Sequence, residues 1–151
     1  MIANDADRKP DPEVLISRSP EETRAIARRV AASCGRRAVL ALHGELGSGK
    51  TCFVQGIAQA LGICRPVTSP TFTIISEYAG SKRLFHIDLY RLGSEDELLT
   101  LGIDEYFESD GITAIEWAER AGRLLPPGCL HAYFEPLPDA DSRRIVIQRG
   151  G

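Results

Sequence analysis

Gly44-Glu45-Leu46-Gly47-Ser48-Gly49-Lys50-Thr51 is the stretch that decides the fold of this 151-residue chain. It matches the pattern G-x-x-x-x-G-K-[ST], a loop that wraps the phosphates of a nucleoside triphosphate. Because glycine lacks a Cβ atom, the backbone of such a loop can turn its N–H groups toward an anion. The pattern predicts that residues 45–51 contact the nucleotide, that Lys50 reaches the β- and γ-phosphates, and that the Thr51 hydroxyl binds Mg²⁺.

The segments on either side of the loop are those that the motif requires. Residues 38–43, Ala-Val-Leu-Ala-Leu-His, form a short apolar run that is typical of a buried parallel strand. Residues 51–61 carry apolar side chains at helical spacing, and Gly62 is suited to end that helix. Strand, loop and helix follow one another in the required order. This context favours nucleotide binding over a glycine-rich turn without a ligand.

The composition is that of a soluble globular protein. Since 18 Lys and Arg face 21 Asp and Glu, the net charge is −3, and no overall basic field draws the chain to nucleic acid. We therefore expect no DNA partner, and we expect another subunit to hold any RNA. The four cysteines lack a C-x-x-C pair, which is typical of reduced thiols in a cytoplasmic protein. Neither a signal peptide nor a membrane-spanning run is expected.

The patterning predicts a flexible extension over residues 1–12 and a single P-loop ATPase domain over residues 13–151. Its expected fold is α/β, a P-loop NTPase-like three-layer fold with a mixed central sheet and an antiparallel hairpin. The expected strands cover residues 13–17, 38–43, 71–78, 83–90, 112–116, 129–134 and 144–148, with the third and fourth forming the hairpin. The expected helices cover residues 20–34, 51–61, 94–102 and 103–108, with one or two helical turns at 118–124.

Two acidic residues lie where they could complete a phosphate-transfer site. Glu116 ends the predicted strand over residues 112–116, at the sheet edge where an acid that binds Mg²⁺ usually lies. We therefore favour a functional role for Glu116 over that of a solvated strand-end acid. Asp88 lies in an apolar strand. Its spacing leaves open whether it serves the site or faces water from the hairpin.

Three further features have a structural as well as a functional interpretation. Trp117 is the single tryptophan, and composition alone favours core packing for it. Residues 69–73, Ser-Pro-Thr-Phe-Thr, occupy the position of a loop that senses the γ-phosphate, but they also suit a proline-stiffened strand entry. His43 and His86 are separated and lack a second cluster of ligands, so we do not predict a metal site from them.

Five segments in this order resemble the TsaE family, the ATPase component of bacterial tRNA threonylcarbamoyladenosine biosynthesis. They are residues 44–51, 69–73, 86–91 (His-Ile-Asp-Leu-Tyr-Arg), 102–107 (Gly-Ile-Asp-Glu-Tyr-Phe) and 115–117 (Ile-Glu-Trp). The resemblance extends from about Ser19 to Pro138. It implies an Mg²⁺-dependent ATPase with weak intrinsic activity that acts with TsaD and TsaB. In that family TsaD transfers the threonylcarbamoyl group to adenosine 37 of tRNAs that read codons beginning with A, so tRNA would meet this chain only through the complex.

The resemblance also implies roles for single residues. Lys50 and the loop amides would hold the phosphates, and Thr51 and Glu116 would bind Mg²⁺. Asp88 would be the second essential acid, which either orients water or binds the metal through water. Lys50, Asp88 and Glu116 are thus the expected catalytic residues.

Four residues gain a place at the nucleotide only through the resemblance. Trp117 would lie beside the nucleotide, Thr23 would approach it, and Thr71 and Thr73 would be switch residues. A phosphate loop also occurs in small-molecule kinases and in nucleotide switches that do not depend on turnover. Both remain alternatives. The chain shows no arginine-rich lid or separate acceptor region, and the presence of two acids favours turnover.

Overall fold

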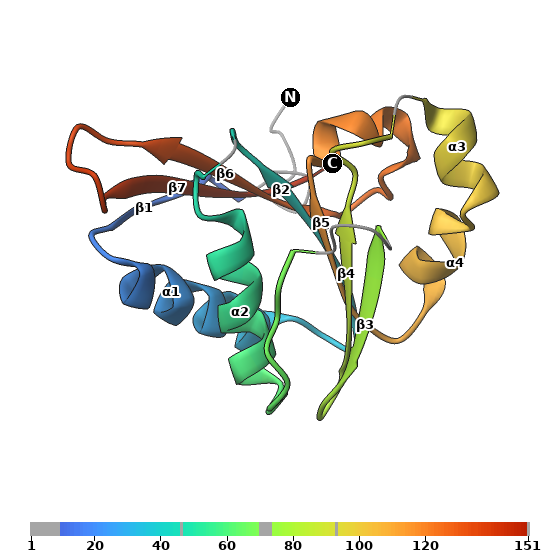
Figure 1. Cartoon of the computed structure of the whole chain (residues 1–151), viewed down its shortest axis with the longest axis horizontal. Coiled ribbons are helices and arrows are strands. Elements are labelled where there is room, and N and C mark those ends of the chain that lie inside the picture. The colour runs from blue at the N-terminus through green and yellow to red at the C-terminus, as the bar shows by residue number, and fades with distance from the viewer. Residues whose placement is uncertain (1–9, 46, 70–73, 93, 151) are drawn as a thin grey trace, which may run out of the picture.

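The computed structural model of the chain describes residues 10–45, 47–69, 74–92 and 94–150. Its strands form one mixed sheet in the order β1-β7-β6-β2-β5-β4-β3 (Figure 1). The strands are β1 (Glu13–Ser17), β2 (Arg37–His43), β3 (Ile75–Ala79), β4 (Arg83–Asp88), β5 (Gly111–Glu116), β6 (Leu130–Pro136) and β7 (Arg143–Arg149). The central strands β6, β2, β5 and β4 are parallel, whereas β1–β7, β6–β7 and β3–β4 pair antiparallel. The mixed sheet and the hairpin are confirmed.

Helices cover both faces of the sheet. They are α1 (Pro20–Ser33), α2 (Lys50–Ala60), α3 (Glu95–Thr100) and α4 (Ile103–Glu108), followed by 3₁₀ turns at Ala118–Arg120 and Gly122–Leu124. α1 and α2 lie on one side, and α3 and α4 lie on the other (Figure 1). This arrangement confirms the three layers.

The two faces of the sheet bury separate hydrophobic clusters. On β2, Leu40 and Leu42 pack into the cluster under α1 and α2, while Val39 and Ala41 pack into the cluster under α3 and α4. A strand that is buried on both faces is apolar along its whole length, because successive side chains point to opposite faces. The apolar run before the phosphate loop is thus the central strand of the sheet.

Close packing of α1 against α2 sets the position of the helix that follows the loop. α1 begins at the Ser19 cap, whose side chain accepts a hydrogen bond from the Glu22 amide at 3.1 Å. The two helices meet at Gly56 of α2, where an added Cβ atom would lie 2.4 Å from the Arg24 carbonyl oxygen. A glycine at this point therefore lets α2 approach the backbone of α1.

Two strand boundaries differ from those expected. β3 begins at Ile75 instead of residue 71: Ile74 has a φ of 62°, which is incompatible with a strand, and residues 71–73 lie outside the described residues. β4 ends at Asp88 instead of Tyr90. Its end follows from a local turn, since the Asp88 carboxylate accepts a hydrogen bond from the Tyr90 amide at 2.9 Å.

The predicted extension over residues 1–12 and the domain beginning at residue 13 stay predictions, because residues 1–9 lie outside the described part of the chain. Within the described ranges, no helix combines the length and the apolar character needed to cross a membrane.

Candidate functional site

A cavity of about 300 Å³ lies at the carboxyl ends of the central parallel strands. β2 runs directly into the phosphate loop, and the strand register pairs Glu116 with Leu42 on one side and with Asp88 on the other. Open α/β sheets bind ligands at this edge. The cavity is lined by Gly47, Ser48, Gly49, Lys50, Thr51, Cys52, Ser69, Asp88, Glu116 and Trp117. All of these except Cys52 were candidates for the site from the sequence.

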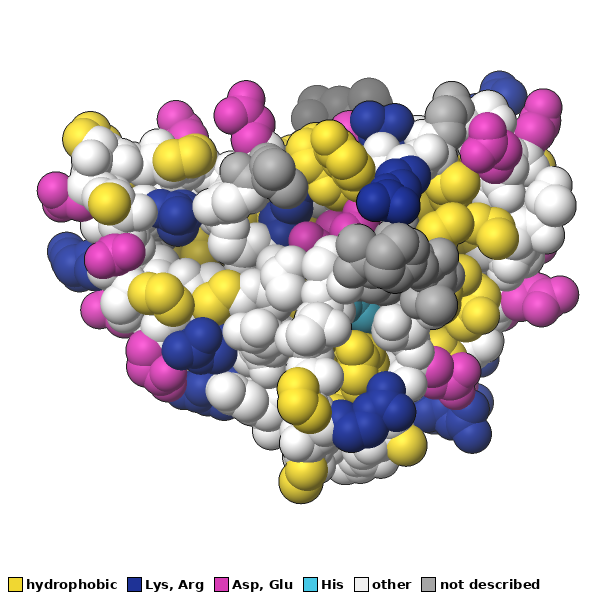
Figure 2. All heavy atoms as spheres, viewed as in Figure 1, with side chains coloured by type: hydrophobic (Ala, Val, Ile, Leu, Met, Phe, Trp, Pro, Cys, Tyr) yellow, Lys and Arg dark blue, Asp and Glu magenta, His cyan; other side chains and the backbone are white. Residues whose placement is uncertain are grey.

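Basic and acidic side chains lie beside one another near the middle of the face shown in Figure 2. The phosphate loop makes one wall of the cavity. Gly49 caps α2 in a left-handed conformation with a φ of 105°, which few other residues adopt. The Ser48 amide donates to the Glu45 carbonyl oxygen at 3.1 Å, and Glu45 itself is exposed. Leu46, also expected at the nucleotide, lies outside the described residues.

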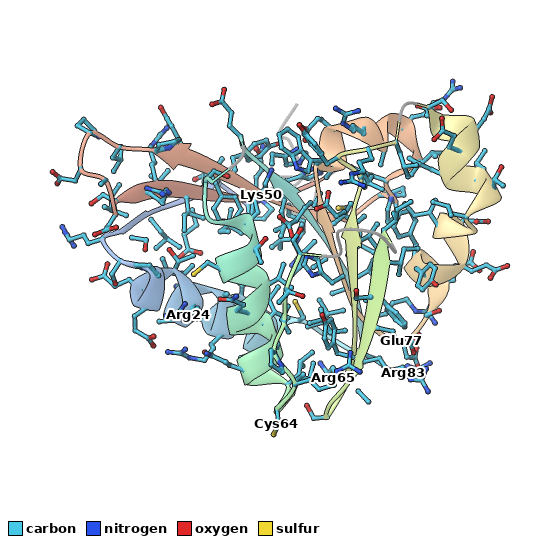
Figure 3. All side chains as sticks on the ribbon, viewed as in Figure 1. Arg24, Lys50, Cys64, Arg65, Glu77 and Arg83 are labelled. Atoms are coloured by element: carbon cyan, nitrogen blue, oxygen red, sulfur yellow. The ribbon has the colours of Figure 1, made fainter. Side chains whose placement is uncertain are left out.

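Lys50 is held at the start of α2 between two groups of the site (Figure 3). Its Nζ atom donates a hydrogen bond to the Gly44 carbonyl oxygen and lies 3.7 Å from the centroid of the Trp117 ring. Only 4% of the residue is exposed. Burial lowers the pKa of Lys50, and the nearby carboxylate of Glu116 partly opposes this change. A poorly hydrated ammonium group beside a cavity attracts an anion strongly.

Thr51 and Glu116 meet across the cavity from α2 and β5. The Thr51 hydroxyl lies 3.1 Å from both carboxylate oxygens of Glu116. Glu116 is 4% exposed and also accepts a hydrogen bond from Nε2 of the fully buried His86, at 2.5 Å. A hydroxyl beside a carboxylate is a pair of hard oxygen donors of the kind that suits Mg²⁺.

Asp88 lies next to Glu116 at the end of β4, and two groups fix its carboxylate. The Ser69 hydroxyl donates to Oδ2 at 2.8 Å, and the Tyr90 amide donates to Oδ1. The structure therefore brings the two predicted acids together at the cavity. The switch residues Thr71 and Thr73 fall outside the described residues, so their role stays a prediction.

Trp117 serves the core and the cavity at once. It has a φ of 58°, an uncommon value for a bulky residue, and this sharp turn directly follows Glu116. Its half-buried ring packs against the cluster under α3 and α4, lies 5.0 Å from the Tyr90 ring, and lines the cavity. The structural interpretation and the functional interpretation of this residue are therefore compatible.

The structure does not bring Thr23 into the cavity lining. Its buried hydroxyl lies 2.7 Å from the Ser17 hydroxyl, so its approach to a nucleotide stays a prediction. Two residues outside the cavity lining contact residues of the site, and neither was assigned to it from the sequence. His86 contacts Glu116, and Arg143 contacts the phosphate loop. The only signal for His86 was a polar side chain two residues before Asp88, on the same strand face.

Comparison with known proteins gives consistent matches over most of the chain. A profile of the family described as "Threonylcarbamoyl adenosine biosynthesis protein TsaE" matches residues 17–145. The chain is 47% identical over 134 residues to the tRNA threonylcarbamoyladenosine biosynthesis protein TsaE of Bacillus subtilis, which spans 88% of this chain and 83% of that protein. The corresponding protein of Treponema pallidum is 40% identical over 132 residues, spanning 87% of this chain and 97% of that protein.

A solved structure agrees with these matches. The crystal structure of YdiB from Bacillus subtilis superposes on this fold with a TM-score of 0.80 and 39% sequence identity. The superposition covers 93% of this chain and 87% of the other.

Proposed function

Because this chain belongs to the TsaE family, we propose that it is the ATP-binding and ATP-hydrolysing subunit of the machinery that forms threonylcarbamoyladenosine in tRNA. The observation that carries the proposal is the meeting of Lys50, Thr51, Asp88 and Glu116 around one cavity behind a phosphate loop. These four residues come from three elements, α2, β4 and β5. The phosphate-loop motif accounts only for Lys50 and Thr51. Their convergence supports turnover as well as binding.

The loop has the properties that a chain of phosphates requires. The Ser48 hydroxyl is buried and has no hydrogen-bond partner among the described residues, although buried hydroxyls rarely remain unpaired. Lys50 is a buried cation at the same wall. A phosphate oxygen would satisfy both groups, and the start of α2 would add its helix dipole. The residues present therefore fit a bound nucleotide.

Thr51 and Glu116 fit a magnesium ion by the chemistry of their oxygens. When bound, the ion would neutralise charge on the phosphates during transfer. His86 holds Glu116 by its Nε2 atom, so this carboxylate is oriented before any ligand arrives. We propose Asp88 as the acid that orients the attacking water, since its carboxylate is fixed beside Glu116.

We propose that the chain acts in the cytoplasm with TsaD and TsaB, which would hold the tRNA and carry out the transfer reaction. Its net charge of −3 provides no general attraction for tRNA. In the proposed division of labour, TsaD transfers the threonylcarbamoyl group to adenosine 37 of tRNAs that read codons beginning with A. The present chain supplies energy through ATP hydrolysis and meets tRNA only within the complex.

The decisive experiment measures ATP hydrolysis by the chain alone and with the TsaB–TsaD pair. We expect weak Mg²⁺-dependent activity alone and a higher rate with the pair. A phosphorylated metabolite formed in place of free phosphate would support a small-molecule kinase instead. Nucleotide binding without turnover, with or without the pair, would support a switch. Glu116→Ala is the matched variant, and it should weaken Mg²⁺-dependent turnover more than metal-free nucleotide binding.

A further inference from the structure

Arg143, the first residue of β7, connects this strand to the phosphate loop through hydrogen bonds. Its Nε atom donates a hydrogen bond to the Ser48 carbonyl oxygen, and its Nη2 atom donates one to the Gly47 carbonyl oxygen, each at 3.1 Å. Its Nη1 atom donates to the carbonyl oxygens of Ala140 and Ser142, each at 2.9 Å. The planar guanidinium group is thus fixed on both sides, by the loop and by the turn that leads into β7.

The contact with Ser48 determines where the next amide points. A trans peptide unit is planar, so its carbonyl oxygen and its N–H group point in opposite directions. None of the described peptide bonds is cis. When Arg143 holds the Ser48 carbonyl oxygen on the outer side of the loop, the Gly49 N–H group must face away from Arg143. An anion-binding loop needs this arrangement, with carbonyl groups outward and amides inward.

The charge of Arg143 is also directed at the loop. All four of its acceptors are backbone carbonyl oxygens, and no carboxylate pairs with it among the residues that the structure describes. A guanidinium group retains its charge in proteins. Arg143 therefore adds positive potential behind the loop, although it is absent from the cavity lining. It acts on a ligand through the loop and not by direct contact.

We propose that Arg143 is a positioning residue of the nucleotide site, which holds the phosphate loop in its binding conformation before the nucleotide arrives. This inference rests on the proposed function of the loop. A glycine-rich loop loses much conformational freedom when it is ordered, and prior ordering removes part of that cost from binding. Lysine cannot replace the guanidinium group fully, because a single ammonium group cannot form the same fork of hydrogen bonds.

The test compares Arg143→Gln and Arg143→Lys with Arg144→Gln. Arg144 is the matched control, because it points to the opposite face of β7 and pairs with the exposed Glu135 at 3.3 Å. Calorimetry gives the dissociation constant of ADP in the full-length proteins. The Ser48 amide donates to the Glu45 carbonyl oxygen within the loop, so its hydrogen exchange, measured without nucleotide, reports the order of the loop independently of activity. Urea unfolding gives the global stability of each variant.

We expect Arg143→Gln to weaken ADP binding about 10- to 100-fold, a loss of the size seen when a residue that orients metal ligands is removed. Arg143→Lys should lie between this variant and the wild type, and Arg144→Gln should match the wild type. Exchange at the Ser48 amide should accelerate more than the change in global stability explains. If Arg143→Gln fails to fold, Arg143→Lys carries the same test.

Wild-type ADP affinity and wild-type exchange at the Ser48 amide in a folded Arg143 variant would overturn the proposal. Failure of the wild type itself to bind any adenine nucleotide would refute the proposed function instead. Even then, the exchange measurement would decide whether Arg143 orders the loop.

Discussion

Replacing His86 with Phe should weaken magnesium-dependent nucleotide binding selectively. His86 is fully buried, and its Nε2 atom lies 2.5 Å from Glu116 Oε2. Phe fills a similar volume but donates no hydrogen bond, so the Glu116 carboxylate keeps only the Thr51 hydroxyl as a partner among the described residues. Hydrogen bonds to charged groups contribute roughly 1.5–3 kcal/mol. Loss of a residue that orients a metal ligand typically lowers metal affinity about 10- to 100-fold, which corresponds to about 1.4–2.8 kcal/mol.

The assay is a pair of calorimetric titrations with ADP, one with Mg²⁺ and one with EDTA. Glu116 is proposed to bind the metal and not the phosphates, so affinity should fall with Mg²⁺ and change little in EDTA. The matched control is Thr113→Val, which removes a different buried hydrogen-bonding group from the same sheet, a hydroxyl that donates to the Tyr106 carbonyl oxygen at 3.3 Å. This control should lose stability without a selective loss of Mg²⁺ dependence. Equal losses for His86→Phe in both titrations would refute the reasoning.

Three further perturbations test other parts of the structure. Lys50→Ala should abolish ADP and ATP binding in calorimetry, because it removes the buried cation of the loop; unchanged affinity would contradict the phosphate-loop assignment. Gly56→Ala should lower the free energy of unfolding in urea by about 1–3 kcal/mol, since the new Cβ atom would lie 2.4 Å from the Arg24 carbonyl oxygen; an increase in stability would show that α1 yields freely. Burial lowers the pKa of His43 and His131, so the unfolded state binds more protons. Stability should therefore rise with pH up to the ordinary histidine pKa of about 6.5 and be lost below it, and His131→Gln should flatten this dependence in urea unfolding.

The secondary-structure elements that carry the candidate site were predicted well, because short sequence patterns encode them. The loop, the strand before it and the helix after it follow from a contiguous motif and from local hydrophobic spacing. Glu116 was recognisable because it ends an apolar run, and parallel strands end at a common edge. The register that places Asp88 beside Glu116 confirms that edge. These inferences used local sequence patterns and the general rule that parallel strands end at one edge of an open sheet. They did not require any specific contact between distant segments.

The partners of these residues could not be predicted in the same way. His86 reaches Glu116 across 30 residues of sequence, and Arg143 reaches Gly47 across 96. Such pairs depend on strand order and register, which local periodicity does not specify. The turn at Trp117 is another example. A positive φ at a tryptophan is contrary to its local preference, and packing of its ring against the cluster under α3 and α4 helps to stabilise that conformation.

These long-range contacts explain why a common loop motif is not sufficient to make a binding site. The motif supplies amides and a lysine, but three glycines leave the isolated loop free to adopt many conformations. In this fold the loop is tied to β5 through Thr51 and Glu116 and to β7 through Arg143. β7 in turn pairs with β1 and β6, so the loop is linked through β7 to strands from both ends of the sequence. The conformation of the loop is therefore a property of the complete sheet, and a change far from the cavity that loosens β7 should weaken the site as a change within the motif does.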